Sequence, residues 1–352
     1  MAINLDKSKY FGKLFYHKLT SKATIDTEVV SNEMCLVLYV AETRGYKWQI
    51  IPDTYIVEIS NGIKNVYFDH RSIPTQTILS ERICFDKYST KIFLQKANLC
   101  TPKGYVVDGS SSEDELTYVF NKLRKPLVVK PLFGSEGNGV RMNIQDLLAY
   151  FEAVDFAKSF NLSDIHKDGV IVEEQVTIGE EYRLFVLDGV LLSCLRKTPC
   201  FVTGDGEHSI EELIAIENKD PFRLLDKDLY PQITIDNLMK LKLAENNVTI
   251  HSVPAKGCRV QLRDVSNIMA GGYAENIPEA ITPQLLQLTK KISQAIPGLK
   301  CCSIDILIDN LYDLHEYSVI EINSNPAYTM NELPQIGEGA QIADAILDYV
   351  FS

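Results

Sequence analysis

Three polar residues near the end of the chain have the types and spacing of a metal site. Asp305 lies in the stretch SIDILI, and Glu321 and Asn323 lie in VIEIN. Side chains alternate along a strand, so Ile320 and Ile322 are expected on the buried face and the polar residues on the other. A hairpin would bring two carboxylates and an amide oxygen together, a set suited to Mg²⁺ beside phosphates. The alternative is the solvated face of an ordinary hairpin.

A second candidate for phosphate chemistry is the glycine-rich stretch LVVKPLFGSEGNGV. It predicts a strand that ends at Lys130 and a loop that contains Gly134, Gly137 and Gly139. Closely spaced glycines let backbone N–H groups approach a phosphate chain, and a lysine adds positive charge. The stretch matches neither a Walker A loop nor a dinucleotide-binding fingerprint. By itself, a glycine-rich stretch of this kind is most often only a turn.

The elements before these stretches are predicted from caps, turns and periodicity. The chain begins with a helix over 27–44, a strand over 48–51 and a hairpin that turns at Asn61-Gly62. Asp86 caps the next helix, where Lys87 alone would be an ordinary solvated lysine, and Ser112 begins another with a capping box.

A further helix is expected to begin at Asn143. Its apolar stripe, at helical spacing, comprises Ile144, Leu147, Leu148, Phe151 and Val154.

Four glutamates flank the next predicted strands, VIVEEQV and GEEYRLFVLDG. The second strand belongs to a hairpin that turns at 188–189. Carboxylates accept hydrogen bonds from sugar hydroxyls and exocyclic amines, so these acids suit adenine and ribose. A solvated rim is the alternative. The acids are Glu173, Glu174, Glu180 and Glu181.

The composition limits the class of protein. The chain has 352 residues, enough for two or three subdomains, and a formal net charge of -12, which disfavours nucleic acid and anionic membranes as partners. Eight cysteines without metal spacing indicate reduced thiols. The polar start lacks the apolar core of a signal peptide, and no apolar run would span a membrane. A cytoplasmic protein is the expectation.

Six stretches follow one another in the order of a known family. They are DKYSTK (86–91), VVKPLFGSEGNGV, VEEQV with GEEYR, FVTGDGEHSIEELIAIEN, LRDVSNIMAGG (262–272), and SIDILI with VIEINSNP. In kind and order they resemble the ATP-grasp superfamily. The resemblance is greatest to the peptide-ligase branch that includes cyanophycin synthetase and the glutathione synthetase portion of the bifunctional bacterial enzyme. It extends from about residue 80 to 330.

The resemblance implies a role for each matching residue. Nucleotide contacts fall on Lys87 and Lys130 for the phosphates, Gly134, Ser135, Gly137 and Gly139 for the loop over them, Glu173, Gln175 and Val176 for adenine, and Glu181 for ribose. Metal binding falls on Asp305, Glu321 and Asn323. Arg263 and Asn267 are implied next to the reacting acyl phosphate, and Arg196 and Arg183 are implied in anion contacts.

The resemblance also implies an α+β ATP-grasp fold. Its parts are a short N-terminal α/β region (1–80), a central lid subdomain (81–170) and a C-terminal antiparallel-sheet subdomain with the metal site (171–352). The implied activity is ATP-dependent carboxylate-amine ligation through an acyl phosphate, with release of ADP and phosphate. ATP and Mg²⁺ are the implied cofactors, as two ions, with Mn²⁺ as a substitute.

The implied substrates are an amino-acid or short-peptide carboxylate and amine, and a homodimer is typical of such enzymes. The alternatives are a modifier of a ribosomal peptide or protein, and a nucleotide-binding protein without catalysis.

Overall fold

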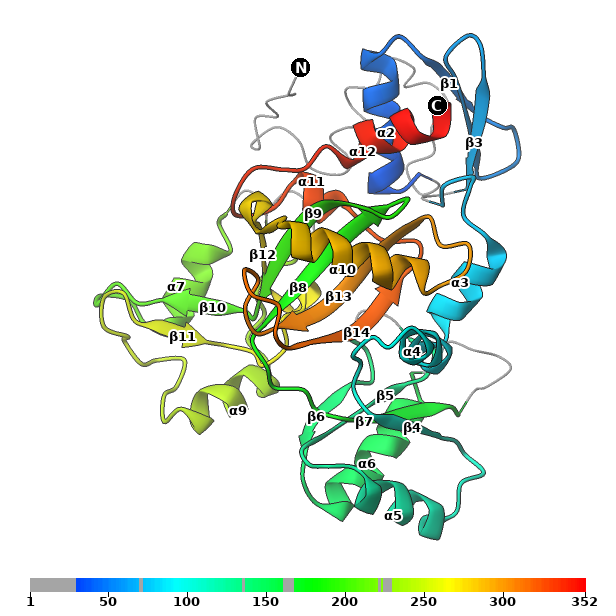
Figure 1. Cartoon of the computed structure of the whole chain (residues 1–352). Helices are drawn as coiled ribbons and strands as arrows, with labels where there is room; N and C mark the ends of the chain where they lie inside the picture. The colour runs from blue at the N-terminus through cyan, green and yellow to red at the C-terminus, as the bar shows by residue number, and fades with distance from the viewer. Residues whose placement is uncertain (1–29, 70–71, 135–136, 161–167, 221–222, 224–229) are drawn as a thin grey trace. The chain divides into compact units, whose positions relative to one another are not determined.

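The computed structural model describes residues 30–69, 72–134, 137–160, 168–220, 223 and 230–352 (Figure 1). These residues form two compact units. The first comprises the described residues up to Thr75 together with Leu192–Pro278 and Ala327–Ser352, and the second comprises Gln76–Leu191 and Glu279–Pro326. The division into 1–80, 81–170 and 171–352 stays a prediction. No described helix is long and apolar enough to cross a membrane.

The first unit begins with a helix and a three-stranded antiparallel sheet, as the sequence predicts. Ser31 caps the helix through the backbone N–H of Met34, and Gly62 takes a φ of +88° in the predicted hairpin turn. The elements are α2 (Asn32–Thr43), β1 (Lys47–Ile50), β2 (Ile56–Ser60) and β3 (Asn65–Asp69). The last helix of the chain, α12 (Ile342–Phe351), packs on α2, and Arg44 joins them through Asp344 at 2.6 Å.

The rest of the first unit surrounds a separate apolar core. A capping box of Ser209 and Glu212 begins α7, and Ile210, Leu213 and Ile214 are buried. Strand β9 pairs with β12, and β10 pairs with β11. The elements are β9 (Val190–Thr198), β10 (Phe201–Thr203), α7 (Ile210–Glu217), α9 (Asn237–Glu245), β11 (Arg259–Gln261), η3 (Ile268–Ala270), β12 (Tyr273–Asn276) and α11 (Thr329–Glu332). The short helix η4 (Pro278–Ala280) contains the point in the chain where the first unit ends and the second continues.

The second unit contains a four-stranded antiparallel sheet with the order β4-β7-β5-β6. Helices α5 and α6 lie on one face of this sheet, where Leu127, Val129 and Val172 enter the core (Figure 1). The predicted capping box of Ser112 and Glu115 begins α5. The elements are β4 (Gly104–Val107), α5 (Glu113–Lys122), β5 (Leu127–Pro131), β6 (Arg141–Ile144), α6 (Leu147–Lys158) and β7 (Val170–Glu174).

The prediction that Asn143 caps a helix is wrong. Asn143 lies in β6 with a φ of +57°, and Ile144 pairs with Leu127 of β5. The helix begins after Asp146, whose side chain accepts a hydrogen bond from the N–H of Ala149. Ile144 fits the helical spacing by position alone, because it enters the same core from the strand.

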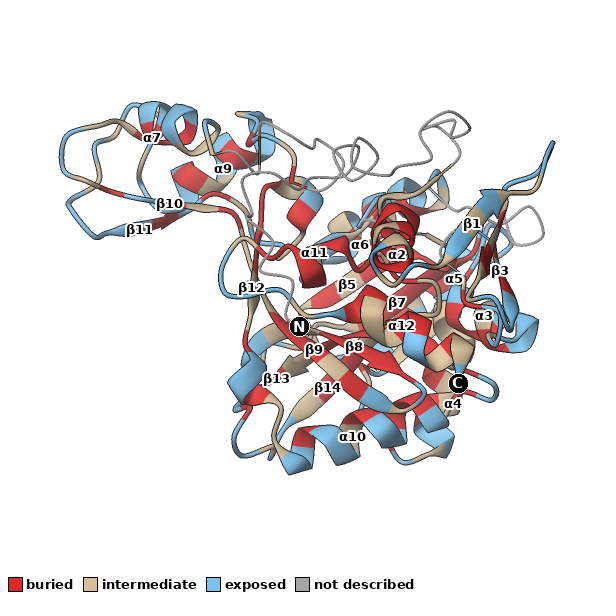
Figure 2. Cartoon of the chain, turned by 90° about the horizontal axis from the view of Figure 1, so that it is seen from above, coloured by how far each residue is buried: buried red, intermediate tan, exposed pale blue. Residues whose placement is uncertain are grey.

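The second unit also contains three adjacent antiparallel strands in the order β8-β13-β14. Helix α10 packs on β8, and Figure 2 shows that β8 and β13 are mostly buried whereas α10 has many exposed residues. Asp188 and Gly189 both have positive φ in the predicted turn after β8. The elements are α3 (Ile78–Phe85), α4 (Lys87–Lys96), β8 (Glu180–Leu187), α10 (Pro283–Gln294), β13 (Cys301–Ile308) and β14 (Tyr317–Asn323).

The alternation expected in β14 is interrupted by a bulge. Asp305 pairs with Glu321, but the next residue, Ile306, pairs with Val319 and passes over Ile320. Ile322 and Val319 are buried as expected of apolar strand residues, whereas Ile320 is only half-buried. The prediction that Ile320 shares the buried face with Ile322 is therefore wrong.

Candidate nucleotide and metal site

The register of β8, β13 and β14 places five polar residues on one face. Arg183 pairs with Asp305, and Asp305 pairs with Glu321, so their side chains leave the sheet on the same side. Asn323, two residues after Glu321, lies on this side as well, as does Glu181 of β8, two residues before Arg183. The structure thus brings together Asp305 of β13 with Glu321 and Asn323 of β14, which lie 16 and 18 residues later in the sequence.

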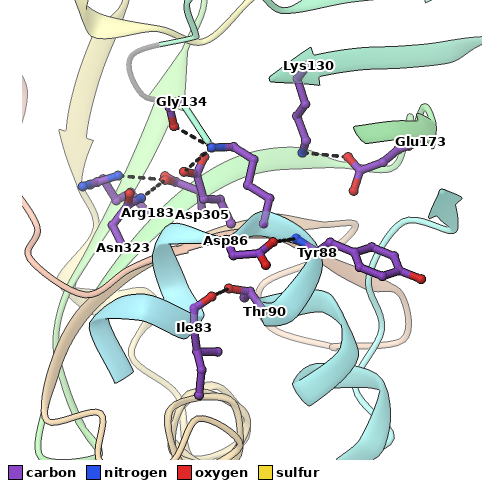
Figure 3. Close-up of polar contacts among 12 residues, drawn as sticks. Ile83, Asp86, Tyr88, Thr90, Lys130, Gly134, Glu173, Arg183, Asp305 and Asn323 are labelled. Carbon is purple, nitrogen blue, oxygen red and sulfur yellow. Dashed lines mark hydrogen bonds and ion pairs between the residues drawn. The ribbon is translucent and has the colours of Figure 1, made fainter. Parts of the chain in front are cut away.

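Asp305 is held firmly from two sides. The guanidinium of Arg183 lies 2.8 Å from Asp305 Oδ2, and the side-chain amide of Asn323 lies 3.2 Å from the same atom (Figure 3). Asp305 is only 7 % exposed. Because a charged partner is so close, the carboxylate has an ion pair to offset the cost of its burial.

Glu321 has a looser environment. Its side chain is 29 % exposed, and its Oε1 lies 3.5 Å from the ammonium of Lys87. The same ammonium donates to the carbonyl of Gly134, at 2.6 Å. Lys87 therefore joins the start of the glycine-rich loop to the face that carries the acids.

These groups fit a divalent metal ion by their chemistry. The described residues contain no group of three or more His, Cys, Asp or Glu that could hold a metal, so two carboxylates need a third donor of another kind. The amide oxygen of Asn323 can supply it, because the O and N of an amide exchange places by a simple flip. Two carboxylates and an amide, with water and phosphate oxygens for the rest, are ligands that Mg²⁺ accepts.

A buried triad of charges lies on the four-stranded sheet. Glu173 of β7 accepts from Lys91 at Oε1 and from Lys130 of β5 at Oε2, each at 2.7 Å. All three residues are less than 9 % exposed. Burial alone would raise the pKa of Glu173, but the ammonium groups of Lys130 and Lys91 lower it below its usual value.

Helix α4 supplies one lysine to the carboxylate of Glu321 and another to the carboxylate of Glu173. Asp86 caps it by accepting from the N–H group of Tyr88, as Figure 3 shows, and from that of Ser89. Lys87 and Lys91 are four residues apart and so lie on one side of the helix. Lys87 reaches Glu321, and Lys91 reaches Glu173. Our sequence reasoning assigned no role to Lys91, although its spacing from Lys87 in DKYSTK is a signal that could have found it.

The glycine-rich loop is described in part, since Ser135 lies outside the described residues. Gly137 and Gly139 have φ values of +73° and +74°, which other residues adopt with strain. A Cβ at Gly139 would lie 2.8 Å from side-chain atoms of Phe160 and Pro131. Glycine is therefore required at 139 by packing as well as by backbone conformation.

The predicted adenine and ribose residues lie along the chain from β7 to β8. The backbone N–H of Gln175 donates to the carbonyl of Pro126, and its side-chain oxygen accepts from the N–H of Asn143. Val176 and Glu181 are half-buried. Glu173 stands apart, because each of its carboxylate oxygens already accepts a hydrogen bond from a lysine. The nucleotide roles of these residues stay predictions.

The other predicted residues belong to the first unit. Arg263 makes a two-pronged ion pair with Asp236, at 2.7 and 2.8 Å, and lowers the pKa of that carboxyl. Asn267 caps η3 by accepting from the N–H of Met269. Arg196 lies 3.0 Å from Glu275, its neighbour across β9 and β12. Their catalytic or anion-binding roles stay predictions as well.

The cysteines fit no role in the site. All eight are free thiols, as the sequence predicts. Burial raises the pKa of Cys84 and of Cys301 to about 12, so these thiols stay protonated and are poor nucleophiles at neutral pH.

The chain is similar to known proteins over most of its length. It is 27% identical over 316 residues to a cyanophycin synthetase from Trichormus variabilis, covering 88% of this chain and 34% of the relative. It is 32% identical over 274 residues to a bifunctional glutathione-biosynthesis protein from Enterococcus faecalis, covering 76% of this chain and 35% of the relative. The chain thus spans about a third of the length of these curated relatives. No family model matches it.

A solved structure shares the fold. The bifunctional glutathione synthetase from Pasteurella multocida superimposes with a TM-score of 0.69 at 25% sequence identity. The match covers 96% of this chain and 46% of that one. It confirms the α+β fold expected from the sequence.

Proposed function

Because the chain belongs to the ATP-grasp superfamily of ligases, we propose that it joins a carboxylate to an amine at the expense of ATP. A carboxylate oxygen of one substrate attacks the γ-phosphorus of ATP, and the bond to the ADP oxygen breaks. The acyl phosphate then meets the amine of the second substrate. The amine nitrogen attacks the carbonyl carbon, phosphate leaves, and the nitrogen loses a proton to give the amide.

The observation that carries this proposal is the position of Lys87. Its ammonium lies 2.6 Å from the carbonyl of Gly134 and 3.5 Å from Glu321. A single cation therefore adjoins a glycine-rich loop and a pair of carboxylates, the groups that a triphosphate with its metal requires. Phosphoryl transfer depends mainly on such positioning and charge neutralisation.

The polar face of β8, β13 and β14 would carry the metal and the phosphates. Asp305, Glu321 and Asn323 would hold divalent metal. We propose two Mg²⁺ ions, which Mn²⁺ could replace. When bound, the metal neutralises phosphate oxygens and orients the γ-phosphate. Arg183 fixes Asp305 by its ion pair, and Lys87 adds positive charge beside Glu321.

The rest of the nucleotide would contact the neighbouring segments. Lys130 would bind a phosphate, and the loop of Gly134, Ser135, Gly137 and Gly139 would close over the phosphate chain. The adenine would lie against the segment of Glu173, Gln175 and Val176, and the ribose hydroxyls would donate to Glu181. Closing a glycine loop over the phosphates would exclude water, which protects an acyl phosphate from hydrolysis.

The remaining proposed roles concern the reacting carbonyl. Arg263 is the proposed donor to the acyl phosphate oxygens, with Asn267 as its neighbour in the same segment and Arg196 as a further anion contact. The ion pair with Asp236 holds the guanidinium of Arg263 in one orientation. Its Nε is buried and has no hydrogen-bond partner among the described residues. Loss of such a donor commonly lowers the rate about a hundredfold.

The substrates are proposed to be amino acids or short peptides. The support is the names of the relatives, a cyanophycin synthetase and glutathione-biosynthesis proteins, and the chain matches only about a third of their length. A ligase whose acceptor is a ribosomal peptide or protein would use the same residues. Mass analysis distinguishes the two, because the first joins small molecules and the second changes the mass of a polypeptide.

The experiment is a screen for ADP formation over single amino acids, pairs of amino acids and dipeptides, with mass analysis of the products. A ligase releases ADP and phosphate in equal amounts and yields a product lighter by one water than its substrates together. ADP with a stable phosphorylated product would identify a phosphotransferase instead. ATP binding without ADP over the whole panel would exclude these small substrates, and would favour either a ribosomal peptide or protein acceptor or a non-catalytic nucleotide-binding protein.

A further inference from the structure

The lysine that the nucleotide roles leave unexplained is Lys91. Its side chain is only 3 % exposed and ends 2.7 Å from Glu173 Oε1. It also donates to the carbonyl of Pro102 and, at 3.1 Å, to the hydroxyl of Thr101. A long cationic side chain is almost never buried to this extent unless its charge is paired.

The charges in the triad do not cancel. Lys91 and Lys130 carry two positive charges, whereas Glu173, their shared partner, carries one negative charge. Burial lowers the pKa of Lys91, and the negative charge of Glu173 opposes this shift. The triad therefore retains one unit of positive charge in a buried place, which is costly unless an anion can approach.

The geometry divides the work between the two lysines. Each ammonium takes a different oxygen of Glu173, so the carboxylate is anchored by Lys91 on one side and aims Lys130 from the other. The backbone is also fitted to this arrangement. A Cβ at Gly104, on β4 opposite Glu173, would lie 2.8 Å from the Cγ of Glu173.

We propose that Lys91 is a positioning residue that tunes the phosphate-binding strength of Lys130 through Glu173. By taking a share of the negative charge of Glu173, Lys91 leaves Lys130 with positive charge for the phosphates of ATP. Without Lys91, Glu173 and Lys130 form a neutral pair that has little attraction for a phosphate. Lys91 itself does not touch the nucleotide. This inference rests on the proposed nucleotide-binding role of Lys130.

A charge series on the triad tests the proposal. The net charge is +1 in the natural protein, 0 in Lys91→Met and +1 again in Lys91→Met/Glu173→Gln. Lys91→Met fills the buried space with an unbranched apolar chain of similar length. Lys91→Arg keeps the charge, and Lys96→Met removes an exposed lysine from the same helix as the matched control.

The readouts are the dissociation constants of ATP and of adenosine, measured by calorimetry, with a thermal melt for each variant. We expect Lys91→Met to weaken the binding of ATP about tenfold, which corresponds to about 1.4 kcal/mol. The dissociation constant of adenosine should not change. Lys91→Arg and the double variant should regain most of this loss, and Lys96→Met should bind like the natural protein.

A purely structural role for Lys91 gives a different pattern. ATP and adenosine would then weaken together, and the double variant, which loses both ion pairs, would bind ATP no better than Lys91→Met. Equal ATP binding by Lys91→Met and the natural protein would also overturn the inference. If Lys91→Met does not fold, Lys91→Arg and the double variant still decide. Failure of the natural protein to bind ATP would instead refute the proposed function.

Discussion

Replacing Glu321 by glutamine should remove activity and leave the fold intact. The side chain is 29 % exposed, and its ion-pair contact with Lys87 is long, at 3.5 Å. Partly exposed pairs of this kind contribute about 0 to 1 kcal/mol. Since 1 kcal/mol shifts the melting temperature of a large domain by about 2–4 °C, Glu321→Gln should melt within about 4 °C of the natural protein.

The free-energy loss in catalysis should be far larger than the loss in stability. A carboxylate that holds a catalytic metal supports several kcal/mol of charge stabilisation in the transition state. A loss of about 4 kcal/mol corresponds to roughly a thousandfold in rate. Asp305→Asn is less informative, because it leaves Arg183 without its partner at 2.8 Å and so costs about 3–5 kcal/mol of stability as well.

The assay is ADP release at saturating ATP and Mg²⁺, with the substrates that the screen identifies, alongside a thermal melt. Glu316→Gln, an exposed acid in the loop of the same hairpin, is the matched control and should retain full activity. A Glu321→Gln protein that keeps more than about a tenth of the natural rate would refute the metal assignment. Loss of activity together with a large drop in melting temperature would show that Glu321 acts on the fold instead.

Three further predictions concern stability. Tyr150→Phe should leave the free energy of unfolding in urea unchanged or raise it by up to about 1 kcal/mol, because the buried hydroxyl of Tyr150 has no hydrogen-bond partner among the described residues. Tyr328→Phe should destabilise the protein, because it removes a hydroxyl that donates to the carbonyl of Glu33. Gly179→Ala should lower the free energy of unfolding by about 3 kcal/mol or more, since the added Cβ would clash with the carbonyl of Ile308. Gly62→Ala, where the Cβ would meet open space, should lower it by about 1 kcal/mol, and equal losses in the two variants would contradict this reasoning. Burial raises the pKa of Glu332 to about 8, above the unfolded value, so its contribution to stability falls as pH rises from 4.5 to 8. Glu332→Gln should therefore melt like the natural protein at pH 5 and higher than it at pH 8, and a constant difference would be the contrary result.

Local signals in the sequence predicted several helix starts and tight turns, although the helix start expected at Asn143 was wrong. Ser112 with Glu115 forms its capping box within one helical turn, and Asp188-Gly189 forms its hairpin within two residues. Such features depend on neighbours in the chain, so the sequence contains what determines them. The pairing of Asp305 with Glu321 was also accessible, because the hairpin that joins them is short.

Features that depend on distant segments were harder to predict. Ile144 continues the apolar stripe of α6 by spacing, but its pairing with Leu127 places it in a strand. The bulge at Ile320 shifts by one residue which side chains of β14 face the core. A pattern of strict alternation along the sequence does not predict such a shift. In each case the pairing partner in a sheet, and not the local pattern, decided the conformation.

The candidate site shows the same limit. Lys130 and Glu173 face each other because β5 pairs with β7, and Lys91 joins them from α4, 39 residues before Lys130 and 82 residues before Glu173 in the sequence. The sequence indicates that each residue type is present. Only the fold shows that one carboxylate is shared by two lysines, and therefore that the triad keeps a positive charge.

The most direct test of the proposed mechanism follows oxygen from the substrate to phosphate. The protein is incubated with ATP, Mg²⁺ and substrates whose carboxylates carry ¹⁸O, and the released phosphate is analysed by mass spectrometry. An acyl phosphate passes one carboxylate oxygen to the phosphate, so each phosphate should carry one ¹⁸O, in an amount equal to the ADP. Unlabelled phosphate would mean that water attacks ATP, and that result would contradict the ligase mechanism.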